Sequence, residues 1–366
     1  MKIGIIFGTR PEAIKLAPVY YELKKRKIST KIVVTGQHKE MLYQVLNVFG
    51  IQVDYDLHIM SSGQGLPELT GNLMLKLNSI FGKEQFDYIL VQGDTTSAYI
   101  GALTAFYHKI PVGHIEAGLR TYNIYSPFPE EVNRRMISVI SSIHFAPTDT
   151  NVKNLRLENY PLDRIIKCGN TIIDALVWVK TNKSDLLKEI RNKYNLYNKR
   201  YILITMHRRE NWGKPMENTL TAIREYLKQH EELFLVFPIH KNPIVRKIVH
   251  QIFDNFNQAI LLEPLEYLDF IAVMDGAHYI MTDSGGIQEE APSLGKPVLV
   301  LRDTTERPEG LEAGTTKLIG NSPAEITKYM KLLEGDLYHN MASRKNPYGD
   351  GHAANIIVSY LVNNKG

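Results

Sequence analysis

The sequence predicts an α/β protein made of two Rossmann-like domains, each built on a doubly wound parallel sheet. Short apolar runs rich in β-branched residues alternate with helical patterns along the 366 residues. The runs are apolar throughout, which is typical of parallel strands that helices cover on both faces. They fall into two series, and the polar, helix-prone segment 179–200 separates them. A chain of this length also exceeds the size at which one core usually stops growing.

The expected strands follow these runs in chain order. The first series is "KIGIIF", "KIVVTG", "DYILVQGD", "IPVGHIEA", "SIHFAPT" and "RIIKCGN", at residues 2–7, 31–36, 87–94, 110–117, 142–148 and 164–170. The second is "RYILITMH", "LFLVFPIH", "AILLEP", "AHYIMTDSG" and "KPVLVLRD", at 200–207, 233–240, 259–264, 277–285 and 296–303. We expect domains at residues 1–170 and 171–350. A final helix at about 351–366 is expected to pack back on the first domain, with Asp350 or Gly351 near its start.

Composition excludes several classes of protein. The chain is 44% hydrophobic and 22% charged, as in ordinary globular proteins, and a net charge of +4 is too small to imply nucleic acid. Its single cysteine, Cys168, excludes an internal disulfide and fits a reducing compartment, although a small buried apolar residue is the simpler interpretation. The first residues lack a signal-peptide core, and no stretch approaches a membrane span. We therefore expect a cytoplasmic protein.

A polar or glycine-containing loop follows nearly every apolar run. Open α/β sheets bind their ligands at the carboxyl ends of the strands. Two domains whose strand ends face one another would enclose a cleft, and we expect the chemistry there.

Two carboxylates follow strands of the first domain. Asp94 comes at the end of "VQGD", where the simplest interpretation of an Asp is a helix N-cap. Glu116 lies within "GHIEAG" at the end of a central strand. Because an ionised group does not stay unsatisfied in a core, Glu116 must be paired or functional.

The segment "SPFPEEVNRRM" supplies two more carboxylates at the start of a helix. Glu131 and Arg135 are four residues apart, and we interpret them as a surface ion pair. Glu130 and Arg134 share the other face. Together with Asp94, the carboxylates at successive strand ends predict general acid and base chemistry.

The second domain places basic residues after its first two strands. In "ITMHRREN", His207 is followed by Arg208 and Arg209, a combination that fits a diphosphate better than core packing. The alternative is a solvated loop with one buried histidine. His240 occupies the corresponding place after the next strand. Neither zinc-type His and Cys spacing nor an Asp-rich calcium loop occurs, so no metal is expected.

The stretch "TDSGGIQEE" is suited to a nucleotide. Ser284, Gly285 and Gly286 are expected to offer backbone N–H groups to phosphate at a helix start. Two carboxylates, Glu289 and Glu290, follow within two turns, which is unfavourable for an anion alone. A nucleotide resolves the conflict, because a carboxylate further along the helix can accept hydrogen bonds from ribose hydroxyls.

Two other residues are candidates for the same ligand. Arg10, in "FGTRPEAIKLAP", could reach a phosphate at a helix start, or could be a surface cap or ion pair. Phe270 could pack against a base, although a core aromatic is the commoner role. The G-x-G-x-x-G fingerprint of dinucleotide-binding domains is absent.

Taken together, these motifs resemble the non-hydrolysing UDP-N-acetylglucosamine 2-epimerase family. The resemblance runs through "GTRPEAIKLAPV", "TGQHKEML", "VQGDTTSA", "HIEAGLRT", "PFPEEVNR", "GNTIIDAL", "TMHRREN", "TDSGGIQEE" and "RDTTERPE". It implies the two-domain glycosyltransferase-B architecture and a homodimer. It also implies reversible interconversion of UDP-N-acetylglucosamine and UDP-N-acetylmannosamine through elimination of UDP and a 2-acetamidoglucal, with no cofactor. The product would supply surface polysaccharides, with capsule, enterobacterial-type antigen and wall-linkage units as alternatives.

The resemblance also implies roles for individual residues. Its catalytic positions correspond to Asp94, Glu116, Glu130, Arg134 and His207. Its UDP-binding positions correspond to Arg10, Lys15, Phe270, Ser284, Gly285, Gly286, Glu290 and Arg307. A second, activating UDP-N-acetylglucosamine is implied at Gln37, His38, Gln64, Arg208 and His240. Gly63 departs from that pattern, because a basic residue is usual there.

Three other functions remain open on the sequence. A hydrolysing relative would release UDP and free N-acetylmannosamine. A glycosyltransferase with the same architecture would use a nucleotide-binding half of the same type. A silent nucleotide-sugar sensor would need no clustered acid and base groups, so the carboxylates and His207 argue against it.

Overall fold

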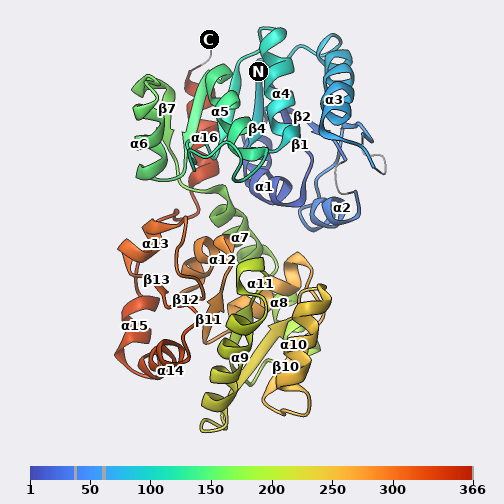
Figure 1. Ribbon diagram of the computed structural model, residues 1–366. Coiled ribbons are helices and arrows are strands. Elements are labelled where there is room, and N and C mark those ends of the chain that lie inside the picture. The colour runs from blue at the N-terminus through green and yellow to red at the C-terminus, as the bar shows by residue number, and fades with distance from the viewer. Residues whose placement is uncertain (37–38, 60–62, 365–366) are drawn as a thin grey trace. The chain divides into compact units, whose positions relative to one another are not determined.

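The computed structural model describes residues 1–36, 39–59 and 63–364, and these form two compact units (Figure 1). The first unit comprises Met1–Val177 and Gly349–Gly366, and the second comprises Trp178–Tyr348. The chain leaves the first unit within helix α7 (Thr171–Asn182) and returns to it after Tyr348.

The first unit is built on a seven-stranded parallel sheet with the order β3-β2-β1-β4-β5-β6-β7. Its strands are β1 (Lys2–Phe7), β2 (Ser29–Val34), β3 (Tyr55–Asp56), β4 (Tyr88–Gln92), β5 (Val112–Ile115), β6 (Ile143–Ala146) and β7 (Ile165–Lys167). Its helices are α1 (Arg10–Lys25), α2 (Lys39–Val48), α3 (Leu66–Phe81), α4 (Thr96–Tyr107), α5 (Glu130–Ile140), α6 (Asp149–Leu157) and α16 (Ala353–Asn363).

The second unit repeats this plan in a six-stranded parallel sheet with the order β10-β9-β8-β11-β12-β13. Its strands are β8 (Arg200–Thr205), β9 (Leu233–Pro238), β10 (Ala259–Leu262), β11 (Tyr279–Thr282), β12 (Val298–Val300) and β13 (Thr316–Leu318). Its helices are α8 (Ser184–Lys193), α9 (Lys214–Leu227), α10 (Pro243–Phe253), α11 (Tyr267–Gly276), α12 (Gly285–Glu290), α13 (Pro308–Ala313), α14 (Pro323–Leu332) and α15 (Asp336–Ala342).

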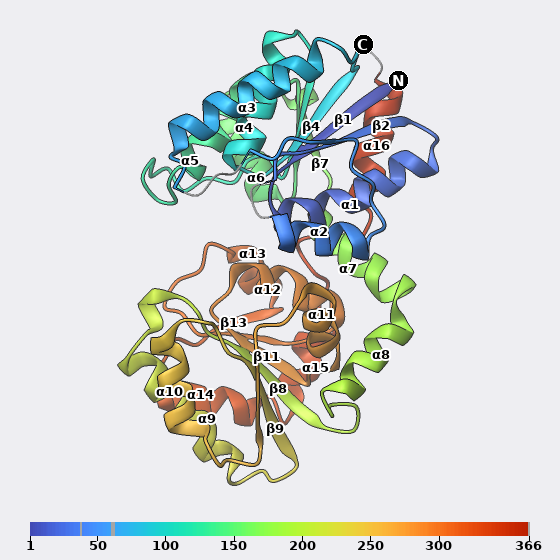
Figure 2. The same ribbon diagram turned by 90° about the vertical axis from the view of Figure 1, so that its right-hand side faces the viewer.

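Helices cover both faces of each sheet. In the first unit, α3, α4 and α5 pack side by side on one face, while α1 and α16 pack together on the other (Figure 2). Arg26 Nη2 donates to Ser359 Oγ at 2.8 Å and ties α16 to the end of α1. In the second unit, α9 packs between α10 and α14, and α8 packs against α11. The predicted fold class, two doubly wound parallel-sheet domains, is confirmed.

Burial explains why the strands were predictable. Ile3, Ile5 and Ile6 of β1 have no exposed surface, as expected for a central strand between two helical layers. Each predicted apolar run overlaps a strand. The sequence does not predict β3 or β13, because two or three residues at a sheet edge show no apolar periodicity.

In both sheets the strand order reverses beside the first strand of the unit, between β1 and β4 and between β8 and β11. The loops that follow these strands are where such sheets bind ligands. Among the helices that the structure describes, none is both long and apolar enough to cross a membrane.

Candidate active site

Glu116 is the centre of a group of polar side chains at the carboxyl edge of the first sheet. It follows β5 with a φ of +65°, in the left-handed region that costs a non-glycine residue energy and is often retained at functional sites. The flanking backbone holds it there, because Gly93 N–H donates to Ile115 O at 3.0 Å and Ala117 N–H donates to Phe145 O at 3.0 Å. The carboxylate is thereby aimed by the sheet itself.

Three side chains converge on the Glu116 carboxylate. Lys15 Nζ, from α1, lies 2.7 and 2.6 Å from its two oxygens. The amide of Gln92, the last residue of β4, also donates to it, and Asn170 Nδ2 donates at 3.4 Å. Sequence reasoning missed Gln92 and Asn170, although both end or follow strands. Lys15, which the resemblance assigns to UDP, is placed here beside a carboxylate.

Asp94 belongs to the same edge of the sheet. Arg134 Nη2 lies 2.5 Å from Asp94 Oδ2, and Asn133 Nδ2 donates to the Asp94 carbonyl at 2.9 Å. Burial raises the pKa of Asp94 above its ordinary value; the charge of Arg134 opposes that shift, and the charge of Glu116 adds to it. A carboxyl group that keeps its proton to higher pH is suited to acid and base work.

The simplest interpretation of Asp94, a helix N-cap, is wrong. The N-cap of α4 is the next residue, Thr95, whose side chain accepts the Ala98 N–H at 3.0 Å. The Asp94 carboxylate is therefore not used by the helix and is directed to Arg134.

The expected surface pair of Glu131 and Arg135 is also wrong. Glu131 has no exposed surface; it accepts the N–H groups of Thr121 and Tyr122 at 3.0 and 3.1 Å and pairs with Arg134 at 3.3 Å. Arg134 thus bridges Glu131 and Asp94. Glu130, the first residue of α5, is half-buried one turn before Arg134.

Arg10 is the first residue of α1, and hydrogen bonds to Glu12 hold the turn before it. Glu12 accepts the Thr9 N–H at 2.7 Å and the Gly8 N–H at 3.0 Å, which closes a capping box. Gly8 cannot be larger, because a Cβ there would lie 2.1 Å from Thr35 Oγ1. The Arg10 side chain is half-buried at the start of the helix.

In the second unit, His207 lies against a buried carboxylate that sequence reasoning missed. His207 Nδ1 is 2.9 Å from Asp283 Oδ1, and Asp283 has no exposed surface. Burial alone would raise the pKa of Asp283, but His207, the Arg208 N–H and the Asn211 amide outweigh it and lower that pKa. Asp283 stands inside the predicted phosphate motif at a strand end, which was the available signal.

The start of α12 carries the predicted anion loop, residues 284–286. The Ser284 N–H donates to Thr282 Oγ1 at 2.9 Å, so it is already used within the protein. A Cβ on Gly285 would lie 3.7 Å from Arg307 Cζ, which places a guanidinium over the bare backbone. The Arg307 guanidinium therefore stands beside the backbone of Gly285.

The two carboxylates of α12 have different environments. Glu289 is buried and pairs with Arg307 Nε, so its charge is compensated within the protein. Glu290 is half-buried, and its Oε1 lies 3.7 Å from where a Cβ of Gly286 would stand. Phe270, on α11, is half-buried too, so it is not a fully buried core aromatic.

The residues of the implied second ligand site are only partly covered. Gln37 and His38 lie outside the described residues, and Gln64 precedes α3 with a half-buried side chain. His240 lies beside His207 with the two ring centroids 6.3 Å apart, and Arg208 adjoins His207 in sequence.

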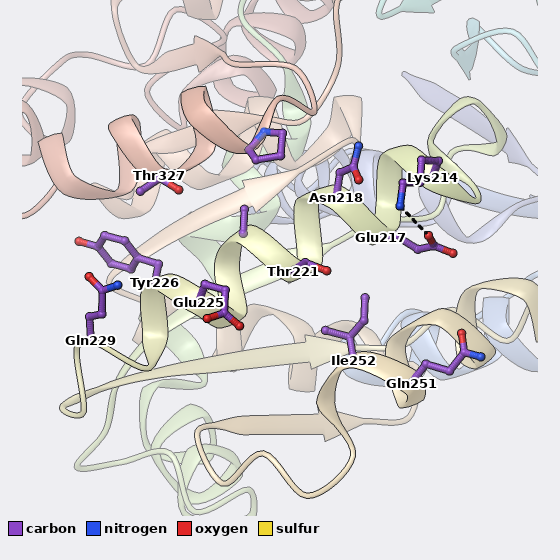
Figure 3. Close-up of a pocket in the computed structure, with 12 residues that line it drawn as sticks. Lys214, Glu217, Asn218, Thr221, Glu225, Tyr226, Gln229, Gln251, Ile252 and Thr327 are labelled. Carbon is purple, nitrogen blue, oxygen red and sulfur yellow. Dashed lines mark ion pairs between the residues drawn. The ribbon is translucent and has the colours of Figure 1, made fainter.

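A separate groove of about 700 Å³ runs along α9 in the second unit, between α10 and α14 (Figure 3). Tyr226 and Gln229 lie at one end of it, and the ion pair of Lys214 and Glu217 lies at the other. None of the predicted site residues lines it. Within the described ranges, His, Cys, Asp and Glu side chains form no group of three or more that could hold a metal ion.

Comparisons with known proteins identify the same family as the sequence motifs do. The sequence profile of UDP-N-acetylglucosamine 2-epimerase matches residues 21–362. The UDP-N-acetylglucosamine 2-epimerase of Neisseria meningitidis is 49% identical over 372 residues, covering 100% of both chains. That of Bacillus subtilis is 50% identical over 367 residues, covering 99% of this chain and 95% of the relative.

Solved structures give the same result. The Neisseria meningitidis enzyme bound to UDP-GlcNAc has a TM-score of 0.88 at 49% identity, with 100% of both chains covered. An S. aureus structure with UDP has a TM-score of 0.85 at 44% identity, covering 99% of this chain and 97% of the other. The Methanocaldococcus jannaschii enzyme with UDP-GlcNAc and UDP has a TM-score of 0.79 at 34% identity, covering 99% and 100%.

Proposed function

The chain belongs to the UDP-N-acetylglucosamine 2-epimerase family, and on this premise we propose that it interconverts UDP-N-acetylglucosamine and UDP-N-acetylmannosamine without releasing free sugar. The observation that carries the proposal is the pair of cation-held carboxylates in the first unit, Glu116 with Lys15 and Asp94 with Arg134. Inversion at C2 needs one group that removes a proton and another that delivers one to the opposite face.

The proposed chemistry is elimination followed by re-addition. The C2 proton of the sugar is not activated by a carbonyl, so its direct removal would be slow. When the bond from C1 to the UDP oxygen breaks, UDP keeps the electron pair, a carboxylate takes the C2 proton, and a C1–C2 double bond forms. The resulting 2-acetamidoglucal is protonated at C2 from the other face, and the UDP oxygen bonds again to C1. Asp94, Glu116 and Glu130 share the two proton transfers.

The second unit is proposed to hold UDP. The N–H groups of Gly285 and Gly286, with Arg307 beside them, suit the diphosphate. Glu290 is proposed to accept hydrogen bonds from the ribose, and Phe270 is proposed to pack on the base. His207 adds a donor for the charge that develops on the departing diphosphate. Solved relatives with UDP and UDP-GlcNAc support this class of ligand.

We test the reaction by proton NMR of the protein with UDP-N-acetylglucosamine in deuterated water. UDP-N-acetylmannosamine carrying deuterium at C2, with no free sugar, is the expected product. Free N-acetylmannosamine with UDP would instead show the hydrolysing reaction. An unchanged spectrum with proven binding would favour a glycosyltransferase or a sensor.

A homodimer is part of the proposal, and an apolar face supports it. Val132, Met136 and Val139 are exposed on α5, and Phe106 and Tyr107 are exposed at the end of the neighbouring helix α4. Large apolar patches of this kind mark protein interfaces. We expect a solution mass near twice the 41.8 kDa of one chain. A Val139→Glu variant should be monomeric by light scattering; a monomeric unsubstituted protein would exclude the dimer.

A second substrate molecule is proposed to act as an activator. His240 and Arg208 adjoin His207, so a ligand on them would lie beside the proposed diphosphate site. We expect added UDP-N-acetylglucosamine to stimulate the reverse reaction, and His240→Ala to reduce that stimulation. A hyperbolic substrate curve without stimulation would remove this part of the proposal.

Finally, we propose that the enzyme works in the cytoplasm and supplies surface polysaccharides. The lone buried Cys168 is compatible with a reducing compartment. Deletion of the gene should remove N-acetylmannosamine-derived units from the cell surface, and fractionation should recover the protein with cytoplasmic enzymes. Unchanged polysaccharide after deletion would contradict this role.

A further inference from the structure

His207 and Asp283 form an asymmetric pair. The His207 side chain is 42% exposed, whereas the Asp283 side chain is fully buried, and the two meet through Nδ1 and Oδ1 at 2.9 Å. Within the described part of the chain, Asp283 Oδ1 accepts no hydrogen bond of regular geometry, and the ring nitrogen 2.9 Å away is its ion-pair partner. The imidazole therefore has one nitrogen against a buried carboxylate and its second nitrogen, Nε2, available to a ligand.

The other oxygen of Asp283 is fully engaged. Oδ2 accepts the His207 N–H and the Arg208 N–H, each at 2.9 Å, and the Asn211 Nδ2 group at 3.0 Å. Three donors to one buried oxygen fix the carboxylate group in rotation. They also favour its ionised form, in line with the lowered pKa of Asp283.

A partly buried series of side-chain hydrogen bonds supports Asn211 in turn. Its Nδ2 group also donates to Leu301 O at 3.1 Å, and its Oδ1 atom accepts Asn321 Nδ2 at 3.0 Å. Thr219 Oγ1 donates to Asn321 Oδ1 at 3.1 Å. These hydrogen bonds link Asn211 to α9 and to the loop after β13. The position of Asp283 is therefore set by three separate elements of the second unit.

We propose that Asp283 is a positioning residue, which holds His207 as the Nδ1–H tautomer and presents Nε2 to the diphosphate of the substrate. This inference rests on the proposed function, which puts UDP beside His207. When Nε2 also carries a proton, the ring is an imidazolium that Asp283 stabilises, and Nε2–H can donate to the departing diphosphate oxygen. No proton needs to pass to Asp283 itself, as in the comparable histidine and aspartate pairs of hydrolases.

The substitution Asp283→Asn tests the proposal because the structure predicts which way the amide turns. Its oxygen must take the Oδ2 place, where three N–H donors converge. Its NH2 group then faces His207 Nδ1, which has to become an acceptor, so the proton moves to Nε2. The side chain keeps its shape, so the fold is expected to survive.

The first readout is the tautomer of His207, from its nitrogen-15 chemical shifts in the ligand-free protein. His240 and Arg208 are the other titratable or charged groups beside the ring, and a His240→Gln variant assigns the His207 signals. We expect the Nδ1–H form in the unsubstituted protein and the Nε2–H form in Asp283→Asn. An Nε2–H form in the unsubstituted protein, or the same tautomer in both proteins, would overturn the proposal.

The second readout is kinetic. We expect Asp283→Asn to lower kcat by about tenfold or more with a small change in KM, because the ring keeps an Nε2–H donor but loses the positive charge that Asp283 stabilises and that acts on the leaving group. In a His207→Ala background the same substitution should have no further effect, since Asp283 acts through His207. Independent, multiplied losses would overturn the positioning role.

Asp174→Asn is the matched control, because Asp174 is also a buried carboxylate, and it accepts the Ala354 N–H at 2.8 Å in the first unit. It should leave both the tautomer and kcat unchanged. If the unsubstituted protein had no epimerase activity, the proposed function would fail, and the tautomer measurement would still decide the role of Asp283.

Discussion

Lys15 Nζ contacts both oxygens of the Glu116 carboxylate, at 2.7 and 2.6 Å, and the two side chains are only 17% and 13% exposed. A cation at this distance compensates the charge of a largely buried carboxylate and fixes its direction. The pair joins α1 to the end of β5, so it connects the first helix of the unit to the proposed proton-transfer group.

Substitution of Lys15 by Met should therefore affect both catalysis and folding. Loss of one partner leaves the other charge buried without compensation, which typically costs about 3 kcal/mol of stability. We expect kcat to fall by about 10²-fold and the urea midpoint to drop. Lys15→Arg, which keeps the charge, should recover most of the stability.

Lys25→Met on the same helix is the control for this experiment. Lys25 is 77% exposed, and its long 3.8 Å contact with Glu22 is a weak surface ion pair. Its loss should therefore change neither measurement appreciably. Equal effects of the two substitutions would show that Lys15 has no special relation to Glu116.

Asp94→Asn should remove a proton-transfer group while keeping its volume. We expect kcat to fall by about 10²- to 10⁴-fold, with loss of deuterium incorporation at C2. Because burial raises the pKa of Asp94, one limb of the pH–rate profile should lie above the ordinary Asp range and disappear in the variant. Asp149→Asn, at an 85% exposed position, is the control. Retained activity with an unaltered profile would rule out this role for Asp94.

Arg307 is expected to contribute to UDP binding in two ways. It brings positive charge to the Gly285 backbone, and it neutralises the buried Glu289 nearby. Arg307→Ala should weaken UDP binding about tenfold or more, as expected for loss of a charge-assisted hydrogen bond. Part of that loss is repulsion by the uncompensated Glu289, so Arg307→Ala with Glu289→Gln should bind better than Arg307→Ala alone.

Calorimetry with UDP measures this pair of effects. Arg246→Ala breaks a comparable arginine–glutamate pair with Glu263 on the surface, so it serves as the control and should leave UDP binding unchanged. If the double substitution bound UDP no better than the single one, Glu289 would have no influence on the ligand.

The sequence predicts the fold well because burial on both faces makes each long strand an apolar run, as in β1 and β8. It also predicts that Asp94, Glu116 and His207 follow strands, because they stand directly after such runs. Whether a residue lies in a strand or just after one depends on its neighbours in sequence, so apolar runs indicate it directly.

The partners of these residues were less predictable because they depend on distant backbone. Glu131 is buried only because the backbone at Thr121 and Tyr122 folds over it, and no periodicity in the helix indicates that. The N-cap of α4 is Thr95 and not, as predicted, Asp94. This difference of one residue decides where the Asp94 carboxylate points. Asp283 was overlooked because its partners, His207 and Asn211, lie more than seventy residues away in sequence.

Acid should destabilise the first unit through two buried histidines. Burial lowers the pKa of His144 to about 4, with Arg120 and Arg164 contributing, and burial lowers the pKa of His114 to about 3. In the unfolded chain both have ordinary values near 6.5. As the pH falls below 6.5, the unfolded state takes up protons that the folded state does not, so the free energy of unfolding decreases.

His144→Leu isolates one of these contributions. His144 has no exposed surface, and within the described residues neither of its ring nitrogens has a hydrogen-bond partner. Each such histidine costs about 1.4 kcal/mol per pH unit below 6.5, or about 2 kcal/mol at pH 5. The variant should therefore lose about 2 kcal/mol less than the unsubstituted protein between pH 7 and pH 5. His250→Leu, at a 46% exposed position, should not change the loss.

The probe has to report on the first unit alone. Both tryptophans, Trp178 and Trp212, belong to the second unit, so their fluorescence follows the wrong transition. Amide hydrogen exchange of β6, the strand that carries His144, measures opening of the first sheet directly. If exchange of β6 accelerated equally in both proteins on acidification, protonation of His144 would not drive the acid unfolding. The loss of stability would then be attributed to His114.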